Sequence, residues 1–306
     1  MLALVGAAVA AVDAVQQQTP FRVTRDTVPV FVTVVDKDNR LATDLPREAF
    51  QVSDNGKAQP ITLFDNSPQP VRLIVMLDVS GSMLRNLPLL RASAEQLFAR
   101  LGPNDQARVG SFGAEITISP EFTRDAAALR AALPTEIDPG APTPLWRAME
   151  TAMAELAGID ERRVVLVLSD GKDTGPRAFN ERFVNQLDVV ERAQRDEIMI
   201  YGIGLQSRGQ PRQMRPGTDL GAMLAADFPD PGLGTAAIDS GGGYFEIRPR
   251  DDLGAAFARV IDELHSQYLI GFTPPARDGK AHKIQVKVTG KDLKPRARKS
   301  YLAPKQ

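Results

Sequence analysis

The sequence predicts an α/β fold with a doubly wound, mostly parallel, Rossmann-like sheet, and a small all-β module built from both chain ends. Two apolar runs, residues 71–77 and 163–168, have the length and branched composition of strands buried on both faces. Between residues 70 and 265 such strands alternate with amphipathic segments, which indicates a parallel sheet covered by helices on both faces. Outside this range, apolar and polar residues alternate with the period of two that is typical of half-buried strands.

Composition limits the classes of function that the chain could have. The 306 residues are 43% hydrophobic and 25% charged, with a net charge of -1, as in an ordinary globular protein. The near-zero net charge argues against wholesale nucleic-acid binding. The absence of cysteine excludes disulfides and thiolate metal sites. Only His265 and His282 occur, so a histidine-rich metal site is excluded, and we expect both on the surface or in the β module.

Residues 1–20 predict a signal peptide followed by a polar linker. The first 14 residues are apolar and alanine-rich, too short to span a bilayer but suited to the apolar core of a secretory signal, with small residues near Ala10 and Ala14 as cleavage points. A basic stretch is missing, and the alternative is an N-terminal helix. We expect export, with no transmembrane segment elsewhere.

Residues 21–68 predict the first part of the β module. A strand is expected over 28–35, with valines 28, 30, 32 and 34 on one face. A turn at 36–39 follows it. A short helical turn is expected at 45–50. The dipeptide Asn55-Gly56 is a strong hairpin signal, and we expect residues 61–64 to form the returning strand.

Residues 69–266 predict the α/β domain. Apolar residues at helical spacing and further apolar runs set the expected elements: helices at 89–101, 144–156, 178–195 and 253–266, and strands at 106–112, 115–119, 198–205 and 244–247. The strand at 115–119 suits an antiparallel edge. Residues 206–243 are rich in glycine and proline and are interpreted as a long insertion with one short helix near 220–226.

Residues 267–306 predict the second part of the β module, with strands at 268–272, 282–288 and about 296–302. Neither terminal piece is large enough to bury its own core, so one sandwich built from both is expected. Residues 277–305 hold ten Lys and Arg against two Asp. This run is either the solvated face of a hairpin or a contact with an anionic surface.

Oxygen-bearing side chains gather at the ends of the two apolar runs. Asp78, Ser80 and Ser82 follow the first run, Asp170 follows the second, and Thr143 precedes a helix between them. The carboxyl ends of parallel strands are where open α/β sheets bind ligands. An oxygen-only ligand set suits a hard divalent cation such as Mg²⁺.

This order of motifs resembles the von Willebrand factor type A domain and its metal-ion-dependent adhesion site. The resemblance implies that Mg²⁺ (or Mn²⁺) is bound by Asp78, Ser80, Ser82, Thr143 and Asp170. By the same resemblance the two serines are direct ligands, Thr143 a switchable one, and the aspartates charge partners acting partly through water. The element Tyr268-Leu-Ile-Gly-Phe-Thr-Pro274 and the flanking strands also resemble bacterial exported proteins related to this family.

The resemblance implies a binding module for adhesion or complex assembly, whose protein partner offers an acidic side chain to the metal. Two other classes stay open: a structural or assembly subunit whose metal only stabilises the fold, and a Mg²⁺-dependent hydrolase. The hydrolase lacks support, because no His lies near these loops, and the phosphate-loop and nucleophile-elbow motifs are absent. We expect Asp173 to cap a helix or lie in a solvated loop, Trp146 to pack in the core, and the protein to be periplasmic, cell-surface or secreted.

Overall fold

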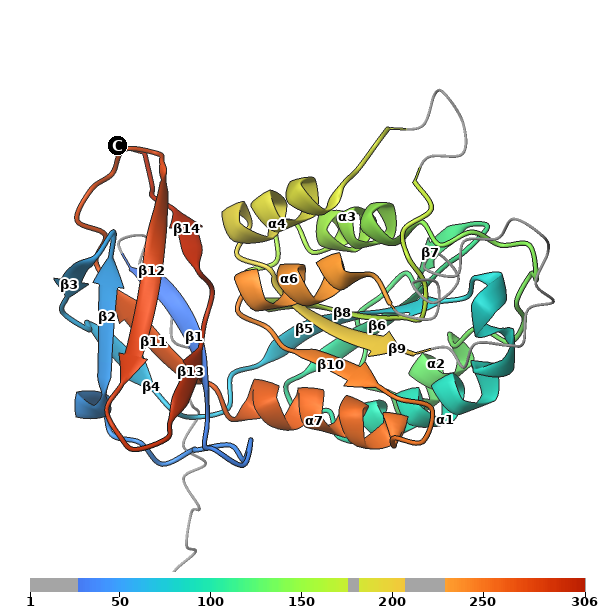
Figure 1. Cartoon of the computed structure of the whole chain (residues 1–306), viewed down its shortest axis with the longest axis horizontal. Helices are drawn as coiled ribbons and strands as arrows, with labels where there is room; N and C mark the ends of the chain where they lie inside the picture. The colour runs from blue at the N-terminus through green and yellow to red at the C-terminus, as the bar shows by residue number, and fades with distance from the viewer. Residues whose placement is uncertain (1–26, 176–181, 207–228, 306) are drawn as a thin grey trace, which may run out of the picture.

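The computed structural model describes residues 27–175, 182–206 and 229–305, so the expected signal peptide at 1–20 lies outside it. The chain forms an α/β domain beside a β module (Figure 1). Among the described helices, none combines the length and the apolar character that crossing a bilayer requires.

The α/β domain is built on a six-stranded sheet in the order β10-β9-β8-β5-β6-β7. All neighbouring pairs are parallel except β6 and β7, which pair antiparallel at one edge. The strands are β5 (Val71–Asp78), β6 (Gln106–Phe112), β7 (Ile116–Ile118), β8 (Arg162–Ser169), β9 (Met199–Leu205) and β10 (Tyr244–Ile247). The parallel strands point away from the β module (Figure 1).

Helices cover both faces of this sheet, as the alternating pattern predicts. One face carries α1 (Leu87–Phe98), α2 (Ala126–Ala131) and α7 (Leu253–His265); the other carries α3 (Leu145–Glu155), α4 (Gln186–Arg195) and α6 (Pro231–Asp239). Strand β5 serves both layers, because Leu73 and Val75 pack on the first face while Ile74 and Met76 pack on the second.

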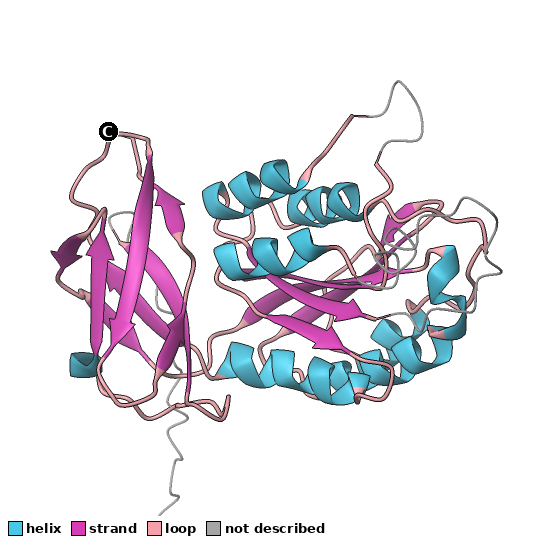
Figure 2. Ribbon diagram, in the orientation of Figure 1, coloured by secondary structure: helices cyan, strands magenta, loops and turns pink. Residues whose placement is uncertain are grey.

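The β module consists of two four-stranded sheets, ordered β13-β1-β11-β4 and β14-β12-β2-β3 (Figure 2). Its elements are β1 (Val28–Val35), a 3₁₀ turn η1 (Arg47–Ala49), β2 (Phe50–Asp54), β3 (Lys57–Gln59), β4 (Leu63–Asp65), β11 (Tyr268–Phe272), β12 (Ala281–Val288), β13 (Lys294–Arg296) and β14 (Ser300–Leu302). Each sheet combines strands from both chain ends, and the two sheets share one apolar core. The predicted fold class is therefore confirmed.

Polar contacts join the two units at the base of the α/β domain. Glu263 on α7 pairs with Arg296 on β13, and Lys299 pairs with Asp239 on α6 at 2.6 Å. Arg162 at the start of β8 lies over the ring of Phe31 on β1, 4.3 Å from its centroid. The β module is thus fixed at the end of the sheet opposite the carboxyl ends of the strands.

Several sequence expectations differ from the structure. The hairpin partner of β2 is β3, whereas residues 63–65 form β4 in the other sheet, because Pro60 interrupts the ladder. The last strand divides into β13 and β14, one in each sheet.

In the α/β domain, α4 begins only at Gln186, where Asn185 and Asp188 form a capping box; residues 178–181 of the expected helix lie outside the described part. The expected helix at 220–226 also lies outside it. Helices α2 and α6 were not expected, although Asp125 caps α2, and Asp230 caps α6, whose first turn holds Pro231.

Candidate metal site

The candidate site lies where the strand order of the sheet reverses. Strands β5 and β8 are neighbours, but the helices that follow them, α1 and α4, cover opposite faces. Their departing loops leave a crevice between them, which is the usual ligand position in an open α/β sheet. Asp78 ends β5 and Asp170 directly follows β8.

Asp78 is completely buried, and both of its carboxylate oxygens accept hydrogen bonds. The backbone N–H of Ser80 donates to Oδ1 at 2.8 Å, and the hydroxyl of Ser169 donates to Oδ2. Burial raises the pKa of Asp78 to about 6, with a contribution from the nearby charge of Asp170, although the hydrogen bonds from Ser169 and Ser80 oppose the shift.

The first loop connects directly to Asp170. The hydroxyls of Ser80 and Ser82 lie 3.1 Å apart, and the Ser82 hydroxyl donates to Asp170 Oδ1 at 2.6 Å. Ser80 and Asp170 are buried, whereas Ser82, in the 3₁₀ turn η2 (Gly81–Arg85), is exposed. The group therefore reaches solvent on the side of Ser82.

The loop that carries Thr143 meets both of the others. A Cβ placed on Gly171 would lie 2.9 Å from Thr143 Oγ1, so the threonine side chain sits directly against the Asp170 loop. Thr174 donates its N–H to the Thr143 carbonyl at 3.0 Å, and Gly81 donates to the Ala141 carbonyl at 3.2 Å. The five residues predicted from the sequence thus lie on three loops in mutual contact.

Ser169 is a member of this group that the sequence reasoning missed. It is the last residue of β8 and is completely buried. Besides donating to Asp78, its hydroxyl oxygen accepts the N–H of Gly171 at 3.1 Å. The signal was available, since Ser169 is the one hydroxyl that ends an otherwise apolar run.

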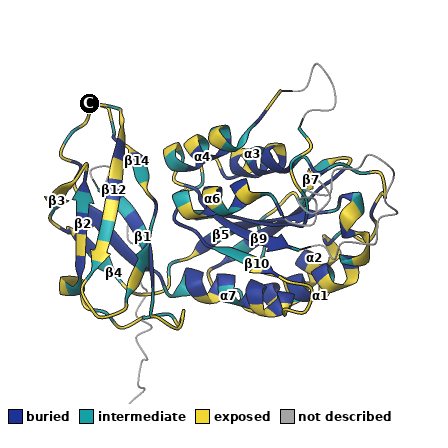
Figure 3. Ribbon diagram, in the orientation of Figure 1, coloured by how far each residue is buried: buried dark blue, intermediate teal, exposed yellow. Residues whose placement is uncertain are grey.

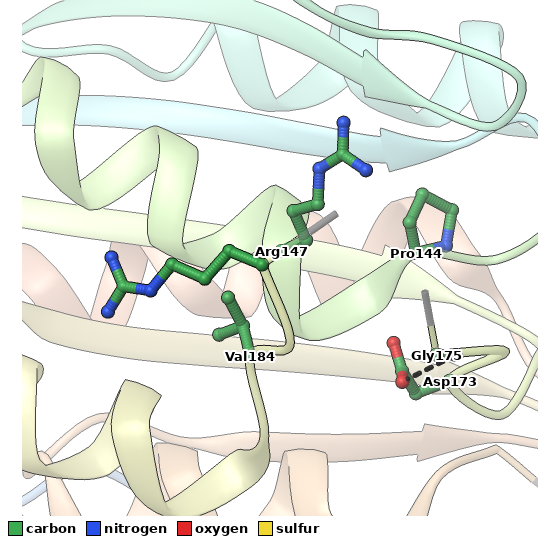
Figure 4. A pocket seen from close by; sticks show the side chains of 6 residues that line it. Pro144, Arg147, Asp173, Gly175 and Val184 are labelled. Atoms are coloured by element: carbon green, nitrogen blue, oxygen red, sulfur yellow. Dashed lines mark hydrogen bonds between the residues drawn. The ribbon is translucent and has the colours of Figure 1, made fainter. Parts of the chain in front are cut away.

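Asp173 and Trp146 have the structural roles expected of them. Asp173 accepts the backbone N–H of Trp146 in the first turn of α3 at 3.3 Å. It also accepts the backbone N–H of Gly175 at 2.9 Å (Figure 4). Trp146 is buried in the core between the sheet and α3. The pocket beside them, lined by Pro144, Arg147 and others, measures about 10 Å³, about the room that one water molecule needs.

The donor set fits a hard divalent cation. Asp78, Ser80, Ser82, Thr143 and Asp170 offer only oxygen atoms, the ligand type that Mg²⁺ and Mn²⁺ prefer. No three His, Asp or Glu of the described residues are grouped so as to hold a metal, so hydroxyls have to contribute. The histidines lie elsewhere: His265 contacts Asp105 at 2.6 Å, and His282 contacts Asp54 at 2.8 Å in the β module. A zinc-type site with histidine ligands does not fit here.

Comparison with protein families adds to this geometry. Residues 73–172 match the model of the von Willebrand factor type A domain. The chain contains a von Willebrand factor type A domain. The matched segment runs from β5 to just past Asp170, so it includes all three loops of the candidate site. No curated protein matches the sequence.

Three solved structures resemble parts of the chain. The vWF domain of the type V pili tip protein Mfa5 from Porphyromonas gingivalis is 14% identical, with a TM-score of 0.48, over 64% of this chain and 95% of that one. An aerotolerance-related membrane protein from Bacteroides fragilis is 16% identical, with a TM-score of 0.47, over 63% and 98%. The pilus adhesin SpaC from Lactobacillus rhamnosus GG is 9% identical, with a TM-score of 0.46, over 88% and 49%. At these levels, none of them says what this chain binds.

Proposed function

We propose that this von Willebrand factor type A domain is a metal-dependent protein-binding module of the adhesion or assembly type. Asp78, Ser80, Ser82, Thr143 and Asp170 would hold one Mg²⁺ or Mn²⁺, and a carboxylate of a protein partner would complete its coordination. The observation that carries the proposal is the meeting of these oxygens on three contacting loops, with one of the five residues, Ser82, exposed to solvent.

The charges of the group favour a bound cation. Asp78 and Asp170 are both buried, and two neighbouring carboxylates in a dry environment repel each other unless a cation lies between or beside them. The remaining donors are neutral hydroxyls. With these hydroxyls as direct ligands and the aspartates acting partly through water, a divalent ion keeps positive character at its open position and attracts an acidic group.

Exposure of Ser82 gives a partner access to the group. A bond between an ionised carboxylate and a cation is also worth most when the interface excludes water. We assign binding rather than catalysis to this site, because the only two histidines of the chain contact other carboxylates far from it.

We further propose that the protein is exported by a bacterial cell and acts in the periplasm, on the cell surface or outside the cell. The support is the apolar, alanine-rich segment at residues 1–14, which has the length of a signal-peptide core.

Calorimetry on metal-stripped protein tests the metal site. We expect Mg²⁺ or Mn²⁺ to bind once per chain, and Thr143→Ala to weaken binding at least tenfold, the usual cost of disturbing a metal site. Thr135→Ala is the matched control, because Thr135 is exposed in the same connection between α2 and α3. A wild-type protein that takes up neither ion, or a Thr143→Ala variant with unchanged affinity, would refute the assignment.

Capture of proteins from a cell-envelope extract tests the binding role. We expect the wild-type chain to retain a partner in Mg²⁺, to release it in EDTA and to recover it when Mg²⁺ is restored, while folded Thr143→Ala retains little. If calorimetry shows the ion but capture is indifferent to EDTA and to Thr143→Ala, the metal only stabilises the fold.

A further inference from the structure

The outer face of the sheet β14-β12-β2-β3 forms a second, separate surface, which we call the basic sheet face. Its outward positions alternate with those that enter the module core, and the strand register places them side by side. They are Ala281, Lys283, Gln285 and Lys287 on β12, Gln51 and Ser53 on β2, Ala58 on β3, and Ser300 and Leu302 on β14. Figure 3 shows exposed residues along β12.

The charges on this face are of one sign. Its outward positions hold Lys283 and Lys287 and no acidic residue, and the surrounding run 277–305 has ten Lys and Arg against two Asp. One of those two, Asp278, accepts a hydrogen bond from the N–H of Lys280 and lies at hydrogen-bond distance from His282. A partner of opposite charge would therefore meet no acidic side chain at the outward positions of this face.

Two sets of cations in the β module have different surroundings. Those that face the α/β domain are neutralised: Arg296 pairs with Glu263, Arg298 with Glu197, and Lys299 with Asp239. On the outer face, by contrast, no ion pair within the described residues involves Lys283 or Lys287. The positive charge that the junction does not use is thus directed outward.

The uncharged side chains of this face favour a polysaccharide over a lipid bilayer as the anionic partner. Gln285 lies between the two lysines, with Ser53 directly opposite it and Gln51 opposite Lys287. Amides and a hydroxyl can each exchange hydrogen bonds with the hydroxyls of a sugar. A surface that docks on a lipid bilayer would instead carry apolar side chains to insert, and here the only large one is Leu302 at the edge.

The spacing of the lysines suits an extended ligand. Four residues along a strand correspond to about 13 Å, so Lys283 and Lys287 mark a line rather than a point. We propose that the basic sheet face binds a linear anionic polysaccharide, with the lysines pairing its carboxylates and the amide and hydroxyl side chains contacting its hydroxyls. This inference does not depend on the metal site, which lies at the opposite end of the α/β domain.

Binding of sodium alginate, a linear polyuronate, to the whole chain tests the proposal, with dextran as the neutral polymer. We expect alginate alone to bind, more weakly at high NaCl and equally with or without EDTA. Exposed ion pairs are individually weak, so Lys283→Gln/Lys287→Gln should weaken binding about three- to tenfold. The control is Lys37→Gln/Arg40→Gln, which removes the same charge from an exposed turn after β1.

The outcomes separate clearly. Absence of alginate binding, equal binding by the double lysine variant, or equal binding of dextran would each overturn the proposal. Tighter binding to vesicles of phosphatidylglycerol than to alginate would overturn it in favour of a lipid surface. Thermal melts of both variants should match the wild type, because all four altered side chains are exposed.

Discussion

Replacing Gly81 by alanine should separate the loops of the candidate site without changing any ligand. A Cβ at this position would lie 2.1 Å from the carbonyl oxygen of Pro139, and 2.8 Å from its carbon. These are backbone atoms, which cannot rotate away as a side chain can. To reach an ordinary contact of 3.4 Å, the loop that leads to Thr143 has to move by about 1.3 Å.

This movement has two costs. Overpacking of a filled site costs about 1–3 kcal/mol, and the hydrogen bond from Gly81 to the Ala141 carbonyl contributes about 0.5–1.5 kcal/mol. We therefore expect Gly81→Ala to lower the free energy of unfolding by about 2–4 kcal/mol and the melting temperature by roughly 5–10 °C. Because a metal site tolerates little displacement of its ligands, its Mg²⁺ affinity should fall at least tenfold.

Calorimetric melting and Mg²⁺ titration measure both effects, with Gly140→Ala as the control. Gly140 belongs to the same loop, but a Cβ there would meet only the side chain of Asp138, at 3.5 Å, so its stability should change by less than about 0.5 kcal/mol. A Gly81→Ala protein with the melting temperature and Mg²⁺ affinity of the wild type would show that the three loops are not held together as described.

Three further predictions concern other parts of the molecule. Ser169→Ala should weaken Mg²⁺ binding about tenfold and Ser169→Thr should restore most of it, because only the hydroxyl orients Asp78; equal affinities in titrations of both variants would contradict this. Burial raises the pKa of Asp105, but hydrogen bonds from His265 and Gly102 outweigh it and leave the pKa below 3.8. The stability that this lowered pKa contributes is therefore present above pH ~4 and is lost as pH falls through the lowered pKa. In urea unfolding, the free energy of unfolding of Asp105→Asn should fall less steeply with acid than that of the wild type. Equal pH dependence of the two proteins would exclude this role. The proposed domain limit at 266/267 predicts that removing residues 267–306 exposes β1 and β2 to protease, and continued resistance would argue against a shared core.

Much of the α/β domain could be predicted because its strands are long apolar runs. Buried on both faces, β5 and β8 have a signature that few other structures share, and the residues after them necessarily reach one edge of the sheet. Asp78 and Asp170 could therefore be placed together from the sequence. Thr143 was placed with them because it precedes a helix of the same α/β pattern, and the family resemblance then implied its role as a switchable ligand.

Other features depended on contacts that a linear pattern does not contain. Strand β4 follows β3 after only a few residues, yet it pairs with β11, a choice made by the apolar core of the module rather than by the Asn55-Gly56 turn. Helix α6 was hidden by Gly232 and Gly234, which have low helix propensity, although packing on β9 overrides that preference. The contribution of Ser169 depends on strand register, which places it beside Asp78.

The α/β domain is inserted into the β module, and this has a mechanical consequence. The polypeptide crosses between the units twice, before β5 and between α7 and β11, and both crossings lie at the end of the sheet remote from Asp78 and Asp170. A force that pulls the sheet edge carrying Asp78 and Asp170 away from the β module is therefore shared by two covalent chain connections. The ion pairs of Arg296 with Glu263 and of Lys299 with Asp239 also resist it. Load would reach the module through two neighbouring strands of one sheet: β4 at its edge, and β11, which has hydrogen-bonded neighbours on both sides. The two connections therefore place any tension between the units on adjacent, hydrogen-bonded strands.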